Sequence, residues 1–322
     1  MSSLRASFSI ASLLLSTPAA AALGNWVEHP EVRLRWLAAD EVAARDGELA
    51  MGLEFVTDPG WHVYWTNPGD AGFPMRVESG SPELTDLRLA FPAPHRYRLP
   101  GGLQALGYEG AVVYPLQGRL RVAPPAERVA LRLSVDFLVC EIECIPYHDE
   151  PRLDLDVATE RRADEDVSTL LEGWRRRVPG PPGGAVRLAA TLAGTPAEPI
   201  ARFLFDGPSL VDAPESDLFL EAHPAVDFGI PERRSTPAGL RFDVALRPKE
   251  RRPEGLRDLE LAWTLTGLSG DRAVASSVRL EPEPSNGAGR TSTLVIVGLA
   301  VLAGSAGVAT LLFLLIRRRT NP

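Results

Sequence analysis

The chain has 322 residues, which is enough for two ordinary domains. Its apolar fraction of 45% and charged fraction of 24% allow each domain a buried core and exclude a disordered, collagen-like or coiled-coil protein. The chain holds 42 acidic and 34 basic residues, for a formal net charge of −8. Without Arg5 and Arg317–Arg319, the balance is 42 acidic against 30 basic residues, a charge of −12. Because that charge repels phosphate backbones, we expect no nucleic-acid partner.

Residues 1–22 are typical of a secretory signal peptide. One early basic residue, Arg5, precedes the apolar run Phe8–Leu15, and a run of small residues follows and ends at Ala22. The apolar run is too short to cross a bilayer, and the small residues suit a signal peptidase, so we predict cleavage after Ala21 or Ala22. An uncleaved membrane anchor is the alternative interpretation.

The C-terminal part is predicted to anchor the chain in a membrane. Residues 294–316 are 23 residues without a charge, about 34 Å long as a helix, which exceeds a bilayer core of about 30 Å. Three arginines follow directly, and the positive-inside rule places the tail, residues 317–322, in the cytoplasm. We therefore predict a single-pass inner-membrane protein with its body in the periplasm. Residues 281–293 hold prolines, glycines and small polar residues, and we predict a flexible stalk there.

The body of the chain is predicted to be mainly β structure in two parts. Short alternating or β-rich runs recur along it, separated by Pro- and Gly-rich stretches, and this spacing is typical of β-sandwiches. Helical periodicity over Asp164–Val178 ends at a Pro/Gly-rich stretch. The predicted parts are a first domain at residues 23–160, a helix and linker at 161–184, and a second β-sandwich domain at 185–280.

Only two cysteines occur, Cys140 and Cys144, and the segment 141–143 lies between them. Residues four apart on a straight strand lie about 13 Å apart, whereas a disulfide needs Cα atoms within about 7 Å, so a bonded pair requires a turn. Closing so short a loop stabilises the fold by only roughly 2 kcal/mol. An oxidising compartment and a tight loop favour a redox-active pair, with an inert structural disulfide as the alternative. A metal site is disfavoured, because two thiolates need further ligands and His148 stands alone nearby.

Four motifs of the first β region carry a resemblance. They are Gly60-Trp61-His62-Val63-Tyr64-Trp65, Asn67-Pro68-Gly69-Asp70-Ala71-Gly72, Leu106-Gly107-Tyr108-Glu109-Gly110 and Phe137-Leu138-Val139-Cys140 to Cys144-Ile145-Pro146. Together they resemble the N-terminal periplasmic domain of the DsbD thiol:disulfide interchange family, in its ScsB-like branch. The resemblance covers roughly residues 25–160. The second β region is similar to the extra domain of ScsB-type proteins only in placement and character.

The resemblance implies an immunoglobulin-like fold, extended here to both sandwiches, and a cysteine pair that cycles between dithiol and disulfide. In the family, the cysteine matching Cys144 forms the mixed disulfide with partners, and the one matching Cys140 resolves it. A cap loop over the thiols corresponds to Gly107, Tyr108 and Glu109. Family members usually continue into a multi-helix electron-transferring membrane domain and a thioredoxin-like domain, which this chain is expected to lack. A separate multi-helix membrane thiol donor or thioredoxin-like protein is therefore implied, with oxidised periplasmic proteins as acceptors.

Several neighbours of the cysteines are further candidates. Glu141 and Glu143 place negative charge beside both sulfurs, which is expected to raise the thiol pKa values, although both are equally well interpreted as solvated loop acids. The ring of Tyr108 is either a cover over the sulfurs or an ordinary turn aromatic. Tyr64 is expected to pack in the core or a loop. His62 lacks a nearby nucleophile motif such as GxSxG, which disfavours a hydrolase.

These observations predict a membrane-anchored disulfide reductase module that passes electrons through the Cys140/Cys144 dithiol and uses neither a cofactor nor a metal. A non-catalytic binding module with a structural disulfide is one alternative. The other is an accessory protein of copper tolerance, a process with which ScsB-like proteins are associated. Direct copper binding is disfavoured by the three methionines and five histidines dispersed along the chain.

Overall fold

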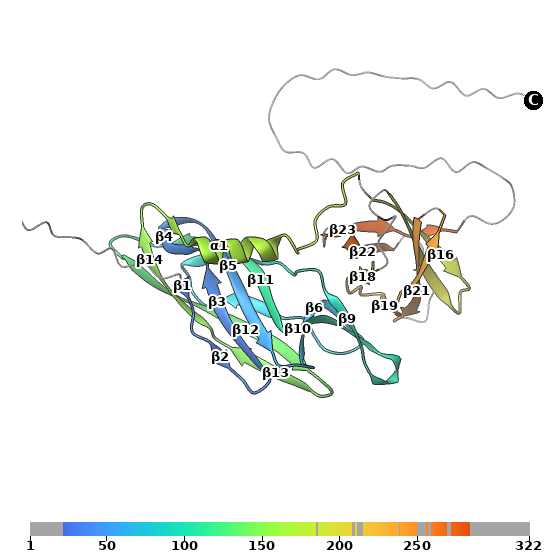
Figure 1. Ribbon diagram of the computed structural model, residues 1–322, viewed down its shortest axis with the longest axis horizontal. Coiled ribbons are helices and arrows are strands. Elements are labelled where there is room, and N and C mark those ends of the chain that lie inside the picture. The colour runs from blue at the N-terminus through green and yellow to red at the C-terminus, as the bar shows by residue number, and fades with distance from the viewer. Residues whose placement is uncertain are drawn as a thin grey trace, which may run out of the picture. The chain divides into compact units, whose positions relative to one another are not determined.

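The chain is mainly β structure, with one α-helix in the part that is described (Figure 1). The computed structural model describes residues 22–184, 186–207, 210, 215–237, 239–249, 256, 259–268 and 272–283. The expected signal peptide up to residue 21, the stalk beyond residue 283, the expected membrane segment 294–316 and its tail lie outside these residues. Within the described ranges, no helix is long and apolar enough to cross a membrane.

The first domain is a sandwich of two sheets. One sheet has the order β1-β3-β5-β11-β8, with β2 paired to β3. Its strands are β1 (Ala22–Leu23), β2 (Val27–Glu28), β3 (Val32–Ala38), β5 (Asp46–Thr57), β8 (Leu84–Leu89) and β11 (Ala111–Arg121). The other sheet has the order β15-β4-β14-β12-β6-β10-β9, with β7 and β13 paired to β12. Its strands are β4 (Asp40–Ala44), β6 (His62–Gly69), β7 (Arg76–Ser79), β9 (His95–Arg98), β10 (Gln104–Glu109), β12 (Arg128–Cys140), β13 (Cys144–Asp149), β14 (Arg152–Ala158) and β15 (Arg162–Ala163).

Alternating burial along the strands accounts for this sandwich. In β12 every second residue from Val129 to Val139 is buried in the main core, as expected for a strand with one face on a core. The ring of Phe55 in the facing sheet meets Tyr114 and Phe137 edge-on, at centroid distances of 5.6 and 5.0 Å. This packing fixes the register of β12, so its even-numbered positions face away from the main core.

The helix α1 (Glu165–Arg175) packs on the first domain, across β5 and β11 (Figure 1). It begins after Asp164, whose Oδ1 accepts a hydrogen bond of 2.8 Å from the backbone N–H of Val167, as an N-cap residue does. Val167 and Leu171 are buried against Leu37 and neighbouring residues. The helix is three residues shorter at its C-terminal end than its periodicity predicted, and it adds a second apolar layer outside the sandwich.

The second domain is also built of two sheets around its own core. Their orders are β19-β21-β17-β16-β24, with β20 paired to β21, and β18-β22-β23. The strands are β16 (Arg187–Gly194), β17 (Pro199–Asp206), β18 (Leu218–Leu220), β19 (Val226–Phe228), β20 (Glu232–Thr236), β21 (Gly239–Pro248), β22 (Glu260–Leu268), β23 (Arg272–Arg279) and β24 (Glu281–Pro282). Phe203, Phe205, Phe242 and Trp263 are buried between the sheets. Backbone hydrogen bonds of Gly180 with Ala273 and Ala275 fasten the incoming chain to β23.

Strand β18 contributes to both cores. Leu218 and Leu220 are buried in the core of the second domain, whereas Phe219 between them is 2% exposed and packs in the core of the first domain. Its ring lies 6.0 Å from that of Trp65, and the guanidinium of Arg96 lies 4.8 Å above it. Because successive side chains of a strand point to opposite faces, Phe219 of the second domain packs in the core of the first domain.

We predict that Phe219→Ala lowers the free energy of unfolding by roughly 3–5 kcal/mol, the usual cost of removing a buried phenylalanine ring. Because the ring packs on Trp65, the amides of β6 should also exchange hydrogen faster, as measured by mass spectrometry. Leu188→Ala, at a partly buried position of the second core, is the control and should leave β6 protected. Unchanged exchange in β6 of Phe219→Ala would show that this contact does not stabilise the first domain.

Candidate functional site

The two cysteines form a disulfide across the end of a β-hairpin. Cys140 is the last residue of β12 and Cys144 the first of β13, and they are direct partners in the ladder. Their Cα atoms lie 4.2 Å apart and the S–S distance is 2.04 Å. The segment 141–143 makes the turn that a bonded pair requires, with the Glu141 N–H donating to the Glu143 carbonyl at 3.3 Å.

The two cysteines differ sharply in exposure. Cys140 is 2% exposed, whereas Cys144 and the three turn residues are exposed. Ile142 at the tip is 85% exposed, far more than the other large apolar side chains of the described residues. A partner approaching the hairpin therefore meets Cys144 first, while Cys140 stays beneath the surface.

Tyr64 on β6 contacts both sulfurs. Its hydroxyl donates a hydrogen bond of 2.9 Å to Cys140 Sγ and lies 3.6 Å from Cys144 Sγ. Tyr64 is buried, together with Cys140, Leu138 and Ala105, in a small cluster on the face of the sheet opposite the main core. Burial raises the pKa of Tyr64 to about 12, so the hydroxyl stays protonated at neutral pH and can act as a donor to sulfur.

His62 lies beside Cys140 and is buried with an unpaired nitrogen. It is the direct partner of Cys140 between β6 and β12, and its ring stacks on Tyr97 and meets Tyr64 edge-on. Its Nε2 is buried and has no hydrogen-bond partner. Burial lowers the pKa of His62, an effect that the charge of Glu109 partly opposes, so the ring is neutral at pH 7.

Acidic side chains surround the hairpin turn. Glu141 and Glu143 are exposed on either side of Ile142. At the end of the neighbouring strand β10, Glu109 Oε1 accepts a hydrogen bond of 2.8 Å from the Gly60 N–H. The approach to Cys144 is therefore negatively charged.

The interpretation of Tyr108 as a cover over the sulfurs is wrong. Tyr108 is buried in the main core, its ring packs edge-on against Tyr114, and its hydroxyl donates to the Pro92 carbonyl at 2.6 Å. The expected cap loop is in fact strand β10, in which Gly107 lies opposite Tyr64 and Glu109 opposite His62. Alternation along β10 explains the error, because Tyr108 points to the face opposite that of the disulfide.

The segment Asp70–Met75 instead meets the Tyr64 ring, through Gly72. Gly72 approaches so closely that a Cβ added to it would lie 2.4 Å from Cζ of the Tyr64 ring, and its φ of +96° also favours glycine. Phe73 follows and is partly exposed, and Met75 is buried in the main core. The glycines of the sequence motif Asn67–Gly72 indicate a change of chain direction at this place.

The site contains no candidate metal centre in the described residues, where no group of three or more potential ligands comes together. His148 pairs with Asp136 at 2.8 Å on the exposed side of the hairpin. The chemistry that the arrangement offers is that of the two sulfurs.

Comparisons with known proteins agree with this geometry. Residues 33–155 match the family model described as the N-terminal part of the thiol:disulfide interchange protein DsbD. No curated protein matches the sequence. The crystal structure of the N-terminal periplasmic domain of ScsB from Proteus mirabilis is similar, with a TM-score of 0.64, 18% identity, and coverage of 82% of this chain and 100% of that chain. The resemblance inferred from the motifs is confirmed, and because the first domain alone makes up about half of the chain, the likeness in fold extends into the second domain.

We predict that His62 makes the protein less stable in mild acid. Its folded pKa is lowered below the unfolded value of about 6.5, so its neutral form stabilises the fold above that pH, and this stability is lost as the pH falls below it. His62→Phe keeps an aromatic ring beside Tyr97 and removes the titration. The melting temperature of the native protein should therefore fall more steeply from pH 7 to pH 5 than that of His62→Phe.

The opposite contribution of His148, whose pKa the hydrogen bond to Asp136 raises, is shared by both proteins and cancels in this difference. Parallel curves for the two proteins would exclude a buried neutral imidazole at position 62.

Proposed function

We propose that this chain, whose residues 33–155 match the family model of the DsbD N-terminal part, is a thiol:disulfide interchange protein that reduces oxidised proteins outside the cytoplasm. The observation that carries the proposal is the unequal burial of a bonded cysteine pair at a hairpin end, with Cys144 exposed and Cys140 buried under Tyr64. An inert disulfide has no need of an exposed sulfur or of a polar side chain directed at both sulfurs.

The exchange proceeds through two thiolate attacks. In the reduced protein, the Cys144 thiolate attacks one sulfur of the acceptor disulfide, and the other acceptor sulfur leaves as a thiolate and takes up a proton. Cys140, as a thiolate, then attacks Cys144 Sγ and releases the second acceptor sulfur, which is protonated in turn. The acceptor gains two electrons and two protons, and the Cys140–Cys144 pair becomes the disulfide seen here.

A donor dithiol restores the reduced pair by the reverse sequence. The donor thiolate attacks the exposed Cys144 Sγ, and Cys140 leaves as a thiolate beneath the surface. The Tyr64 hydroxyl, 2.9 Å from Cys140 Sγ, stabilises this leaving thiolate by a charge-assisted hydrogen bond. Tyr64 therefore assists the departure of Cys140 in this direction, and in the other direction it keeps more of the attacking Cys140 in the thiolate form.

The partners follow from the same proposal. A separate multi-helix membrane thiol donor or a thioredoxin-like protein reduces the pair, and oxidised periplasmic proteins accept the electrons. The sequence features outside the described residues support a periplasmic body released by a signal peptide and anchored by one inner-membrane helix at 294–316. Glu141 and Glu143 select among thiol partners by charge.

We predict that Cys140→Ser accumulates mixed disulfides between Cys144 and partner proteins, because the resolving thiol is missing. The adducts should appear on a non-reducing gel of cells that express a competent electron donor, and should disappear with reductant. Cys144→Ser is the matched variant and should form none, because Cys140 is buried. A Cys140→Ser protein without adducts in such cells would favour a structural disulfide.

We predict that Tyr64→Phe raises the pKa of the Cys140 thiol by about one to two units, because a hydrogen bond to a charged group contributes about 1.5–3 kcal/mol and one pKa unit corresponds to 1.36 kcal/mol. The pKa is measured from the ultraviolet absorbance of the thiolate in a Cys144→Ser background. Tyr97→Phe alters a neighbouring tyrosine that stacks on His62 and should leave the thiol pKa unchanged. Equal thiol pKa values in the Tyr64→Phe and Tyr97→Phe proteins would remove Tyr64 from the mechanism.

A further inference from the structure

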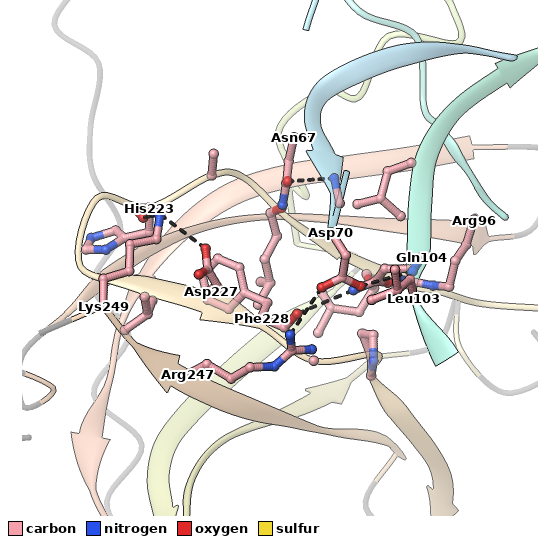
Figure 2. Close-up of a pocket in the computed structure, with 18 residues that line it drawn as sticks. Asn67, Asp70, Arg96, Leu103, Gln104, His223, Asp227, Phe228, Arg247 and Lys249 are labelled. Carbon is pink, nitrogen blue, oxygen red and sulfur yellow. Dashed lines mark hydrogen bonds and ion pairs between the residues drawn. The ribbon is translucent and has the colours of Figure 1, made fainter. Parts of the chain in front are cut away.

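The segment that covers Tyr64 begins at Asp70, and Asp70 is bound by both domains. Figure 2 shows its carboxylate between Gln104 and Arg247. One oxygen, Oδ2, accepts a hydrogen bond of 3.0 Å from the Gln104 N–H, and Oδ1 lies 3.2 Å from Nη1 of Arg247. Only 10% of the Asp70 side chain is exposed, whereas 56% of the Arg247 side chain is, so the pair has one buried and one solvent-facing partner.

Asn67 fastens the same turn from the other side. Its Nδ2 donates a hydrogen bond of 2.7 Å to the Leu220 carbonyl of β18, and its Oδ1 accepts one of 3.0 Å from the Gly69 N–H. The end of β6 is therefore held by one backbone acceptor and one guanidinium of the second domain. These two contacts flank the start of the covering segment.

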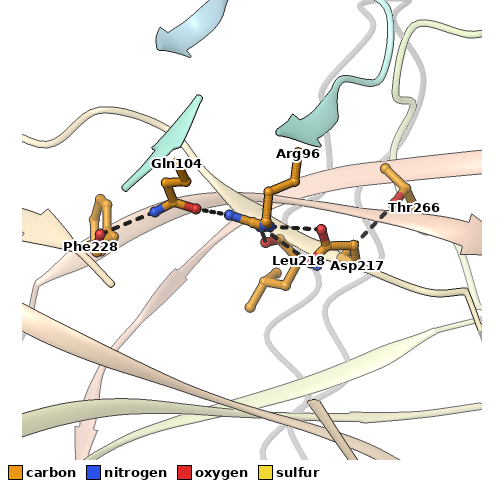
Figure 3. A network of polar contacts seen from close by, with 6 residues as sticks. All are labelled: Arg96, Gln104, Asp217, Leu218, Phe228 and Thr266. Carbon is orange, nitrogen blue, oxygen red and sulfur yellow. Dashed lines mark hydrogen bonds and ion pairs between the residues drawn. The ribbon is translucent and has the colours of Figure 1, made fainter. Parts of the chain in front are cut away.

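A polar network continues this interface along β9 and β10 (Figure 3). Arg96 donates to Asp217 Oδ2 at 2.9 Å, to the Leu218 carbonyl at 2.7 Å and to the Gln104 side chain. The Gln104 amide in turn donates to the Phe228 carbonyl at 3.4 Å. Gln104 is therefore hydrogen-bonded to the second domain through its side chain and to Asp70 through its backbone N–H.

Gly72 and Tyr64 lie between Asp70 and the sulfur of Cys140. Gly72 lies against the Tyr64 ring, and Tyr64 donates to Cys140 Sγ. Gly69 and Gly72 have φ values of +94° and +96°, the chain bends between them, and Asp70 and Gly72 are separated by a single residue. A continuous line of contacts thus joins Arg247 of the second domain to the buried sulfur.

We propose that the second domain is a brace for the redox centre, with Arg247 a positioning residue that holds the segment Asp70–Met75 on Tyr64 through Asp70. Through Tyr64 the brace keeps the donor hydrogen bond on Cys140 and keeps Cys140 closed to reagents other than Cys144. Its consequence for electron transfer rests on the proposed function, whereas the brace itself is a property of the fold.

The cleft between the domains, of about 300 Å³, is part of this interface. Its charged groups are paired with one another, Asp70 with Arg247 and Asp227 with Lys249 at 3.1 Å (Figure 2). The first of these pairs joins the two domains, whereas Asp227 and Lys249 both belong to the second domain.

The test uses the protein with Cys140 as its single thiol, Cys144→Ser, and measures the rate of maleimide labelling of Cys140 and the pKa of its thiol. Arg247→Ala should raise the labelling rate by roughly threefold or more, as expected for easier local opening. It should also raise the thiol pKa towards the value of Tyr64→Phe. Arg247→Lys keeps the positive charge, so its labelling rate and thiol pKa should lie between those of Arg247→Ala and those of the protein with Arg247. Arg187→Ala breaks an exposed ion pair with Asp206 inside the second domain and should change neither.

Asp70→Asn supplies a second variant if Arg247→Ala perturbs the second domain. It keeps an oxygen for the Gln104 N–H and loses the charge that faces Arg247. The double variant Asp70→Asn/Arg247→Ala should change the labelling rate and the thiol pKa of Cys140 by no more than the larger of the two single changes. The reason is that both substitutions remove the same contact, between Asp70 and Arg247.

A labelling rate and thiol pKa that match those of Arg187→Ala, or additive effects of Asp70→Asn and Arg247→Ala, would overturn the brace. No partner protein enters the measurement, so the brace stands or falls independently of the mixed disulfides that test the proposed function.

Discussion

The proposed redox centre depends on the hydrogen bond from the Tyr64 hydroxyl to Cys140 Sγ. A buried hydroxyl needs a partner, and burial that raises the pKa of Tyr64 to about 12 keeps its proton in place for that bond. In the disulfide, sulfur is a weak acceptor, whereas a thiolate at the same position is a strong one. The contact therefore strengthens when the disulfide is broken, and it favours the state in which Cys140 carries charge.

The geometry of the hairpin supplies the other half of the mechanism. Cys140 ends β12 at a position that faces the small cluster around Tyr64, whereas Cys144 opens β13 in the exposed part of the turn. Direct pairing in an antiparallel ladder brings the two sulfurs together without a longer loop. The end of this one hairpin thus provides both an exposed sulfur, which the proposed mechanism assigns to partners, and a buried sulfur, which it assigns to resolving the adduct.

The strands and the cysteine pair could be predicted from the sequence because both are local signals. Alternation in Val129–Val139 and the spacing of Cys140 and Cys144 need no knowledge of distant residues. Which tyrosine lies against the sulfurs could not be predicted in the same way. Tyr64 and Tyr108 are both tyrosines in β-rich motifs, and only the pairing of β6 with β10 and β12 decides which one faces the sulfurs. The contact of Asp70 with Arg247 joins residues 177 positions apart, and no local pattern marks it.

The proposed exchange does not require the segment Asp70–Met75 to move away from Tyr64. A partner reaches Cys144 from solvent, and the resolving attack by Cys140 moves a sulfur only across the width of one hairpin, whose Cα atoms are already 4.2 Å apart. A cover held by the second domain is therefore compatible with turnover, because it closes only the route to Cys140. An oxidant or a small thiol that arrives from the side of Gly72 meets a buried ring, whereas a protein partner that arrives at Ile142 meets the reactive sulfur. In the proposed arrangement the second domain would support selectivity by contacts that lie outside the exchange itself.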